Sequence, residues 1–287
     1  MFRTLTFAVF FLLAVAARGQ IQVELKFSRF QYIAYEPVRA QVTITNLAGR
    51  DIELRDDRDQ TWYGFEVTTN GGRMLAPIRR PYEPGLRIGA GESVTRKIDL
   101  TPLFPISDLG AYHVRANVFF ADLNKFFYAR TKVFEVTSAR PIWQRTVGDP
   151  EGNGVRTYSL MTNRFPDHTS LYVRVEDKTN NLIYATYSLG RVISLDEPQA
   201  EVDRENRLHV LQPSGPRLWA YSVVNLDGRL LKHAAYSQAR AIPRLRRTPE
   251  GVITVTGGIL NPAALPSGTG KAAPKSSTRA PESPPED

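Results

Sequence analysis

The chain of 287 residues contains no cysteine. Without cysteine the protein cannot form a disulfide, a thiolate metal site or a thiol nucleophile. Small disulfide-bonded folds and cysteine-dependent enzymes are therefore excluded, and the structure must be stabilised by packing alone. The length suits two domains of roughly 100 to 130 residues, each large enough to bury its own core.

Long apolar runs are also scarce, and the longest covers only residues 7–17. Eleven residues cover about half of a bilayer core, which needs about 20, so an uncleaved membrane anchor is disfavoured. Arg3 before this run and small residues after it, up to Gly19, form the three-part pattern of a signal peptide. We predict a signal peptide over residues 1–19 and a periplasmic or secreted protein. Elsewhere the apolar residues come in short alternating runs, so we do not expect an integral membrane protein.

Lysine is rare as well, with 8 lysines among 37 basic residues. The net charge is +8, and it becomes +6 when Arg3 and Arg18 leave with the signal peptide. An exported protein of this charge is expected to meet acidic or anionic envelope partners rather than nucleic acid. The alternative is that the arginines, which are spread along the chain, serve solubility only.

Patterns of catalysis and metal binding are missing. The four histidines His113, His168, His209 and His233 have no short ligand spacing, and no G-x-S-x-G or S-x-x-K motif occurs. His113 and His209 alternate with apolar residues, which favours outward positions on strands. We predict no enzyme, and no catalytic, cofactor-binding or metal-binding residue. A pair of carboxylates for glycoside hydrolysis stays open, because such pairs form only in space.

Acidic residues crowd only between Asp51 and Asp59, where arginines stand between them. Oxygen ligands at this spacing could hold calcium, but the interleaved cations weaken the field that attracts a divalent ion. We expect a self-neutralising surface loop.

The segment from Ile21 to about Thr137 has the pattern of a half-buried sheet. Apolar residues alternate with polar ones over 38–45 and 114–120, and further strands are expected over 21–30, 62–68, 93–100 and 126–136. Turn residues separate these runs. About seven strands over roughly 115 residues predict a two-sheet sandwich.

The motif Asp108-Leu109-Gly110-Ala111-Tyr112-His113-Val114 resembles the D-x-G/A-x-Y-x-C segment of immunoglobulin-like domains. The segments 35–46 and 91–100 are similar to macroglobulin-type and related bacterial immunoglobulin-like modules. The resemblance covers about 40% of the chain and implies that Tyr112 forms a tyrosine corner. Val114 stands where antibody domains have cysteine, so the disulfide between the sheets is absent.

After this segment, residues 147–154 are rich in turn formers and suggest a domain boundary. Beyond it, Leu171-Tyr172-Val173 and Leu208-His209-Val210 are 37 residues apart, and 189–192 and 227–230 keep nearly the same offset. This rhythm resembles the strand repeats of β-propeller blades, but the segment is too short for four blades. We therefore expect a small antiparallel sheet stack, with a partial propeller as the alternative.

The predicted organisation is all-β: a signal peptide (1–19), an immunoglobulin-like β-sandwich (20–139), a linker (140–155), a second small antiparallel all-β domain (156–260) and a disordered tail rich in proline, alanine and serine (261–287).

For function we expect a non-enzymatic binding or assembly module of the cell envelope that acts through protein contacts. The alternatives are a peptidase inhibitor using the stretch 70–91, a carbohydrate-binding module and a polysaccharide-acting hydrolase.

Stacking platforms for sugar could come from Trp62, Tyr63, Phe65, Trp143, Trp219 and Tyr221, although core packing is the expected role of aromatics in a sandwich. Arg240, Arg244, Arg246 and Arg247 are the densest basic stretch, either a solvated face or a site for an anionic or glycan polymer.

Overall fold

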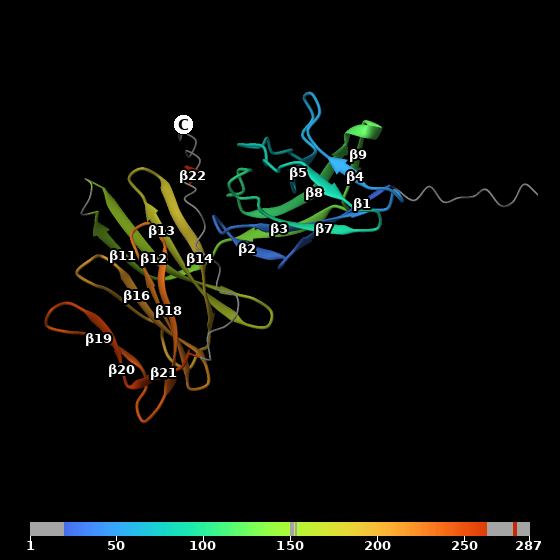
Figure 1. Ribbon diagram of the computed structural model, residues 1–287. Coiled ribbons are helices and arrows are strands. Elements are labelled where there is room, and N and C mark those ends of the chain that lie inside the picture. Colours follow the sequence, from blue (N-terminus) through green and yellow to red (C-terminus); the bar gives the residue numbers. More distant parts are fainter. Residues whose placement is uncertain (1–19, 150–151, 153, 263–277, 280–287) are drawn as a thin grey trace, which may run out of the picture.

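The computed structural model describes residues 20–149, 152, 154–262 and 278–279. The predicted signal peptide and most of the predicted disordered tail lie outside these residues. In the described part the protein is all-β, with the short 3₁₀ turn η1 (Ala121–Leu123) after β8 and no α-helix. No helix in that part of the chain could cross a membrane. The N-terminal and C-terminal strands form two bodies that lie side by side (Figure 1).

The N-terminal body is a sandwich of a three-stranded and a five-stranded sheet, with a small β4-β6 ribbon beside them. Its strands are β1 (Ile21–Phe27), β2 (Gln31–Ile33), β3 (Arg39–Asn46), β4 (Ile52–Leu54), β5 (Tyr63–Thr69), β6 (Leu86–Ile88), β7 (Ser93–Asp99), β8 (Gly110–Phe120), β9 (Lys125–Tyr128) and β10 (Lys132–Thr137). The order is β1-β3-β7 in one sheet and β2-β10-β8-β5 in the other, with β9 paired to β8. All of these pairs are antiparallel except β2 with β10, which is parallel.

The alternation of apolar and polar residues predicted from the sequence is seen in the strands of this sandwich. In β3 the side chains of Ala40, Val42 and Ile44 are buried, while the residues between them are exposed or partly exposed. The alternation predicted for β8 is confirmed in the same way. One expected strand, over 126–136, is interrupted at Ala129, whose amide donates to Ala116 O, and β9 and β10 form on either side.

Tyr112 forms the tyrosine corner that the motif implied. Its hydroxyl donates to Asp108 O at 2.9 Å, and its ring stacks on Phe134 with centroids 5.3 Å apart. The bond satisfies the polar tip of a side chain that is only 2% exposed. The connection before β8 is thereby fixed to the core without a disulfide.

The C-terminal body contains two antiparallel meanders and a hairpin. Its strands are β11 (Arg140–Gly148), β12 (Val155–Arg164), β13 (Thr169–Asp177), β14 (Leu182–Val192), β15 (Gln199–Val202), β16 (Leu208–Gly215), β17 (Leu218–Val224), β18 (Leu230–Gln238), β19 (Arg244–Arg247), β20 (Ile253–Thr256), β21 (Gly258–Leu260) and β22 (Thr278–Arg279). The first sheet has the order β11-β12-β13-β14-β22 and the second β15-β16-β17-β18-β21, while β19 and β20 pair with each other.

These elements form three layers. Leu171 and Val173 of the first sheet and Leu208 and Val210 of the second belong to one hydrophobic core between the sheets. On the far side of the second sheet, the β19-β20 hairpin covers another core around Trp219. Strand β16 is therefore buried on both faces, which explains why it lacks a polar face.

Of the repeated segments found in the sequence, only the first pair occupies comparable positions in the structure. Both Leu-x-Val segments lie on strands that face each other across the core. The second pair of segments is not equivalent, because 189–192 belongs to β14 whereas 227–229 form the turn before β18. Within the predicted tail, residues 278–279 form β22 beside β14.

Residues 140–148 form β11, where the sequence indicated a linker over 140–155. The strand pairs with β12 along its length and is mostly exposed, with Trp143 and Val147 packed against the core. An edge strand of this kind needs few apolar residues, so it has the composition of a linker.

Candidate functional site

Strand β1 is an edge strand, because β3 is its only neighbour in the sheet. Leu47 N donates to Gln20 O at 2.8 Å, and backbone direction alternates along an antiparallel pair. The amides and carbonyls of Ile21, Val23 and Leu25 therefore point away from β3. Within the described residues none of these groups has a backbone partner.

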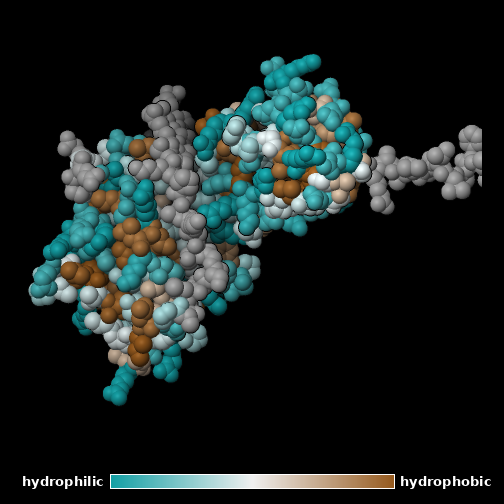
Figure 2. All heavy atoms as spheres, in the orientation of Figure 1, coloured by the Kyte–Doolittle hydropathy of each residue, from teal (hydrophilic) through white to brown (hydrophobic). Residues whose placement is uncertain are grey.

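This free edge opens into a groove of about 940 Å³. One wall is β1, and the other is formed by Phe127 and Tyr128 of β9 and by Arg130 and Lys132 after it. We call this space the seam groove, since it lies where β1 of one sheet meets β9 and β10 of the other. Figure 2 shows apolar side chains exposed among hydrophilic ones over the N-terminal body.

The seam stays open because β2 covers only part of β10. The parallel pair joins Gln31–Ile33 to residues 135–137, and Glu135 N donates to Phe30 O at 2.8 Å. Val133, two residues earlier, presents its backbone to the same side and has no strand beside it there. The β1 wall of the seam groove thus offers unpaired backbone, the usual requirement for adding a strand.

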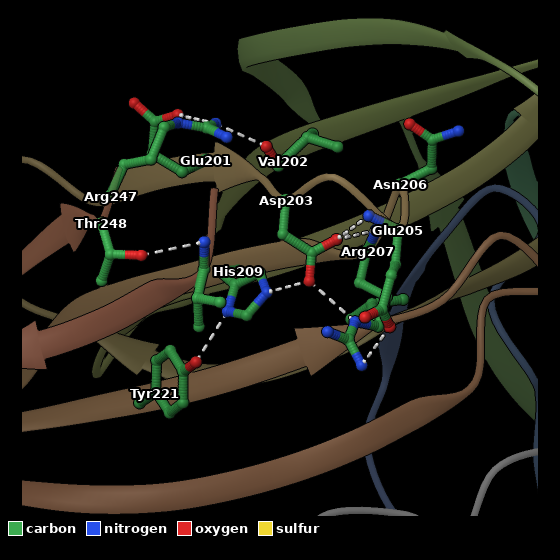
Figure 3. Close-up of polar contacts among 12 residues, drawn as sticks. Glu201, Val202, Asp203, Glu205, Asn206, Arg207, His209, Tyr221, Arg247 and Thr248 are labelled. Atoms are coloured by element: carbon green, nitrogen blue, oxygen red, sulfur yellow. Dashed lines mark hydrogen bonds and ion pairs between the residues drawn. The ribbon is translucent and has the colours of Figure 1, made fainter. Parts of the chain in front are cut away.

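A second candidate site, a cluster of polar side chains, lies in the C-terminal body under the β19-β20 hairpin (Figure 3). His209 of β16 joins Asp203 Oδ2 through Nε2 at 2.9 Å and Tyr221 Oη through Nδ1 at 2.7 Å. Arg207 Nε donates to the same Asp203 Oδ2 at 2.7 Å. The other oxygen of Asp203 accepts the amides of Glu205 and Arg207, both at 2.9 Å, which closes the turn between β15 and β16.

The protonation of this cluster follows from its environment. Burial raises the pKa of Asp203, but hydrogen bonds from His209 and Arg207 outweigh it and hold the pKa below its ordinary value. Burial lowers the pKa of His209, against the pull of Asp203, and burial raises the pKa of Tyr221 to about 12. A neutral His209 therefore donates from Nε2 to the carboxylate, and the Tyr221 hydroxyl donates to Nδ1.

Each polar atom of the His209 ring thus has a partner inside the protein, and the residues Asp203, His209 and Tyr221 are each 5% exposed. The expectation that His209 faces outward is wrong, because the β19-β20 hairpin covers that face of β16. The cluster fixes the β15-β16 turn.

The remaining histidines are scattered. His113 is half-buried on β8, His168 contacts Asp167 Oδ1 at 2.8 Å, and His233 Nδ1 lies 3.0 Å from Ser222 Oγ. In the part of the chain that the structure describes, no three histidine or carboxylate side chains are grouped as a metal site would need.

The aromatic candidates serve packing. Trp62 and Tyr63 are 1% exposed, Trp219 and Tyr221 are 4% and 5% exposed, and Phe65 and Trp143 are partly buried against the cores. A sugar-stacking platform needs exposed ring faces, so this distribution weighs against a carbohydrate site on these residues.

Part of the charge on the charged candidates is neutralised by neighbours. In the acidic loop Asp51 pairs with Arg87 at 2.9 Å and Glu53 with Arg55 at 3.1 Å. In the arginine stretch, Arg244 pairs with Asp196 and Arg247 with Glu201.

The seam groove was not found by sequence reasoning. Its only sequence signal is the alternation of residues 21–27, which predicts a strand but not that one side of it lacks a neighbour.

No family model matches the chain, and no curated protein matches it. Among solved structures, the chain is similar to Spo0M, a sporulation control protein from Bacillus subtilis. The two are 10% identical with a TM-score of 0.31, over 59% of this chain and 91% of that one. A similarity at this level carries no argument about function.

Proposed function

We propose that the protein is an exported, non-enzymatic binding module of the cell envelope that acts through protein contacts. The observation that carries this proposal is the unpaired edge of β1, which opens into the seam groove. A partner segment in extended conformation would add to β1 as a further strand, with the unpaired backbone groups of Val23 and Leu25 supplying the hydrogen bonds.

An immunoglobulin-like identity for the N-terminal sandwich belongs to the same proposal. It is supported by the tyrosine corner of Tyr112 and by the parallel pairing of β2 with β10 beside an otherwise antiparallel sandwich. Such sandwiches present edges and end loops as contact surfaces, and the seam groove is an edge of this kind.

Proline at position 23 tests strand addition directly. The Val23 amide points away from β3, so Val23→Pro removes a donor from the free edge and leaves the β1-β3 ladder intact. The full-length protein and this variant are used to capture partners from an envelope extract. We expect Val23→Pro to lose a partner that the neighbouring Gln22→Ala retains, and amide exchange at Val23 and Leu25 to slow when that partner binds. Equal capture by both variants would contradict the proposal.

Export has its own test, the N-terminal sequence of the protein recovered from its producing cells. A mature chain starting at or near Gln20 supports export. An intact Met1 in cytosolic protein contradicts it.

A second candidate, inhibition of a peptidase, is favoured by the segment 76–85. The exposed Arg79 and Arg80 lie between Pro77 and Pro81, and the segment is tied down where Ile78 N donates to Leu103 O at 2.7 Å and Trp62 Nε1 to Glu83 O at 3.0 Å. An anchored, proline-rich loop can enter an active site with little loss of entropy. Trypsin is the probe: inhibition at one-to-one ratio supports this role, and rapid cleavage between Arg79 and Arg80 rules it out.

A further inference from the structure

We infer that the seam groove selects an extended segment rich in aspartate or glutamate. This inference rests on the proposed function and names the chemistry of its partner. Among the groove-lining residues, Lys26, Arg130 and Lys132 are cationic and Glu24 is the one acid.

The charges are not balanced within the protein. Glu24 lies 3.7 Å from Lys26 Nζ, so this pair neutralises itself at one wall. Arg130 and Lys132 are exposed and make no ion pair with any residue that the structure describes. Next to the groove lining, Lys125 of β9 places its Nζ 5.4 Å from the centre of the Phe127 ring. The wall opposite β1 is therefore a cationic surface without internal counter-charges.

The geometry of a β-strand determines which side chains of a partner would contact this wall. Successive side chains of an added strand point to opposite faces, so every second residue faces inward. Inward residues would meet Phe127, which is half-buried against the core, and Leu47, which is 44% exposed. Acidic residues between them would reach Arg130 and Lys132 at the rim. A segment alternating apolar and acidic residues fits both requirements.

A second copy of the chain fits less well. Its β1 edge would bring its own Lys26, Arg130 and Lys132 toward the same seam, so like charges would meet. An acidic partner is attracted by the same residues and associates faster at low salt.

The probes are two fluorescein-labelled peptides of eight residues, one alternating valine with glutamate and the other alternating valine with lysine. Binding to the full-length protein is followed by fluorescence anisotropy at low and physiological salt. We expect the glutamate peptide to bind at least tenfold more tightly than the lysine peptide, and salt to weaken it. A glutamate peptide with every second amide methylated should lose binding, because it cannot pair with β1.

Variants locate the selectivity. Arg130→Glu combined with Lys132→Glu should abolish or reverse the preference for the glutamate peptide. Lys97→Glu, an equally exposed change on β7, should keep it. Both positions of the double variant are solvent-exposed, so thermal unfolding of each protein serves as the check that the fold is retained.

The possible outcomes distinguish selectivity for acidic segments from strand addition as such. Equal affinity for the glutamate and lysine peptides, with loss on methylation, overturns acidic selectivity and leaves strand addition standing. Absence of binding, or binding that ignores methylation, overturns strand addition itself and this inference with it. A dimer in light scattering that Val23→Pro dissolves would identify a second copy as the occupant and overturn the acidic partner.

Discussion

Arg29 Nη1 donates to Tyr172 Oη at 2.7 Å, a contact between residues 143 positions apart that joins the two bodies of the protein. The same guanidinium forms an ion pair with Glu36, which is 5% exposed. Beside it Arg174 Nη2 donates to Ala34 O at 2.6 Å. A small apolar cluster of Ile33, Met161 and Tyr172 completes the contact.

We expect two substitutions at this contact to lower the free energy of unfolding by unequal amounts. Tyr172→Phe removes one hydrogen bond and should lower the free energy of unfolding by about 1 kcal/mol. Arg29→Ala leaves the buried Glu36 without its cation and should cost about 3 kcal/mol. Urea unfolding measures both, with Arg79→Ala as an exposed control that should change little. Equal effects of the two changes would mean that the ion pair contributes nothing beyond the hydroxyl.

Gly228 lies where the two C-terminal sheets approach closely, and we expect a substitution there to destabilise the protein. It has φ +75°, and a methyl group added there would lie 2.3 Å from the Ala185 Cβ on β14. Gly72 has φ +78° with open space around it, so Gly72→Ala reports backbone strain alone, about 1 to 2 kcal/mol. Gly228→Ala should cost a further 1 to 3 kcal/mol, roughly, because the sheets must move apart. Similar melting temperatures for the two variants would contradict this packing.

The tyrosine corner predicts a modest loss in Tyr112→Phe. The ring keeps its stacking on Phe134, while Asp108 O loses its donor, so the expected cost is about 1 kcal/mol. Tyr82→Phe, at a position 85% exposed, is the matched control and should be neutral. An unchanged urea midpoint in Tyr112→Phe would show that water replaces the bond at no cost.

We expect stability to depend on pH through two histidines, the buried His209 and the half-buried His233. Burial holds the pKa of His209 and of His233 below the ordinary value of 6.5. The unfolded chain therefore binds more protons than the folded one as the pH falls through 6.5, and the free energy of unfolding should decrease there. His209→Gln should reduce this slope, leaving the part due to His233. Urea midpoints at pH 7.5 and 5.5 decide the point, and a slope unaffected by His209→Gln would disprove it.

The sequence by itself determined the all-β class, the alternation of strands such as β3 and β8, and the tyrosine corner of Tyr112. These features depend on neighbours within a few residues, where side-chain periodicity and one local motif are sufficient. The tertiary structure alone decided that β1 keeps a free edge, that a hairpin covers His209 and that Arg29 meets Tyr172. Each of these depends on which distant segments lie side by side, and the same alternating strand can face solvent, a second layer or an open groove without any change in its own residues.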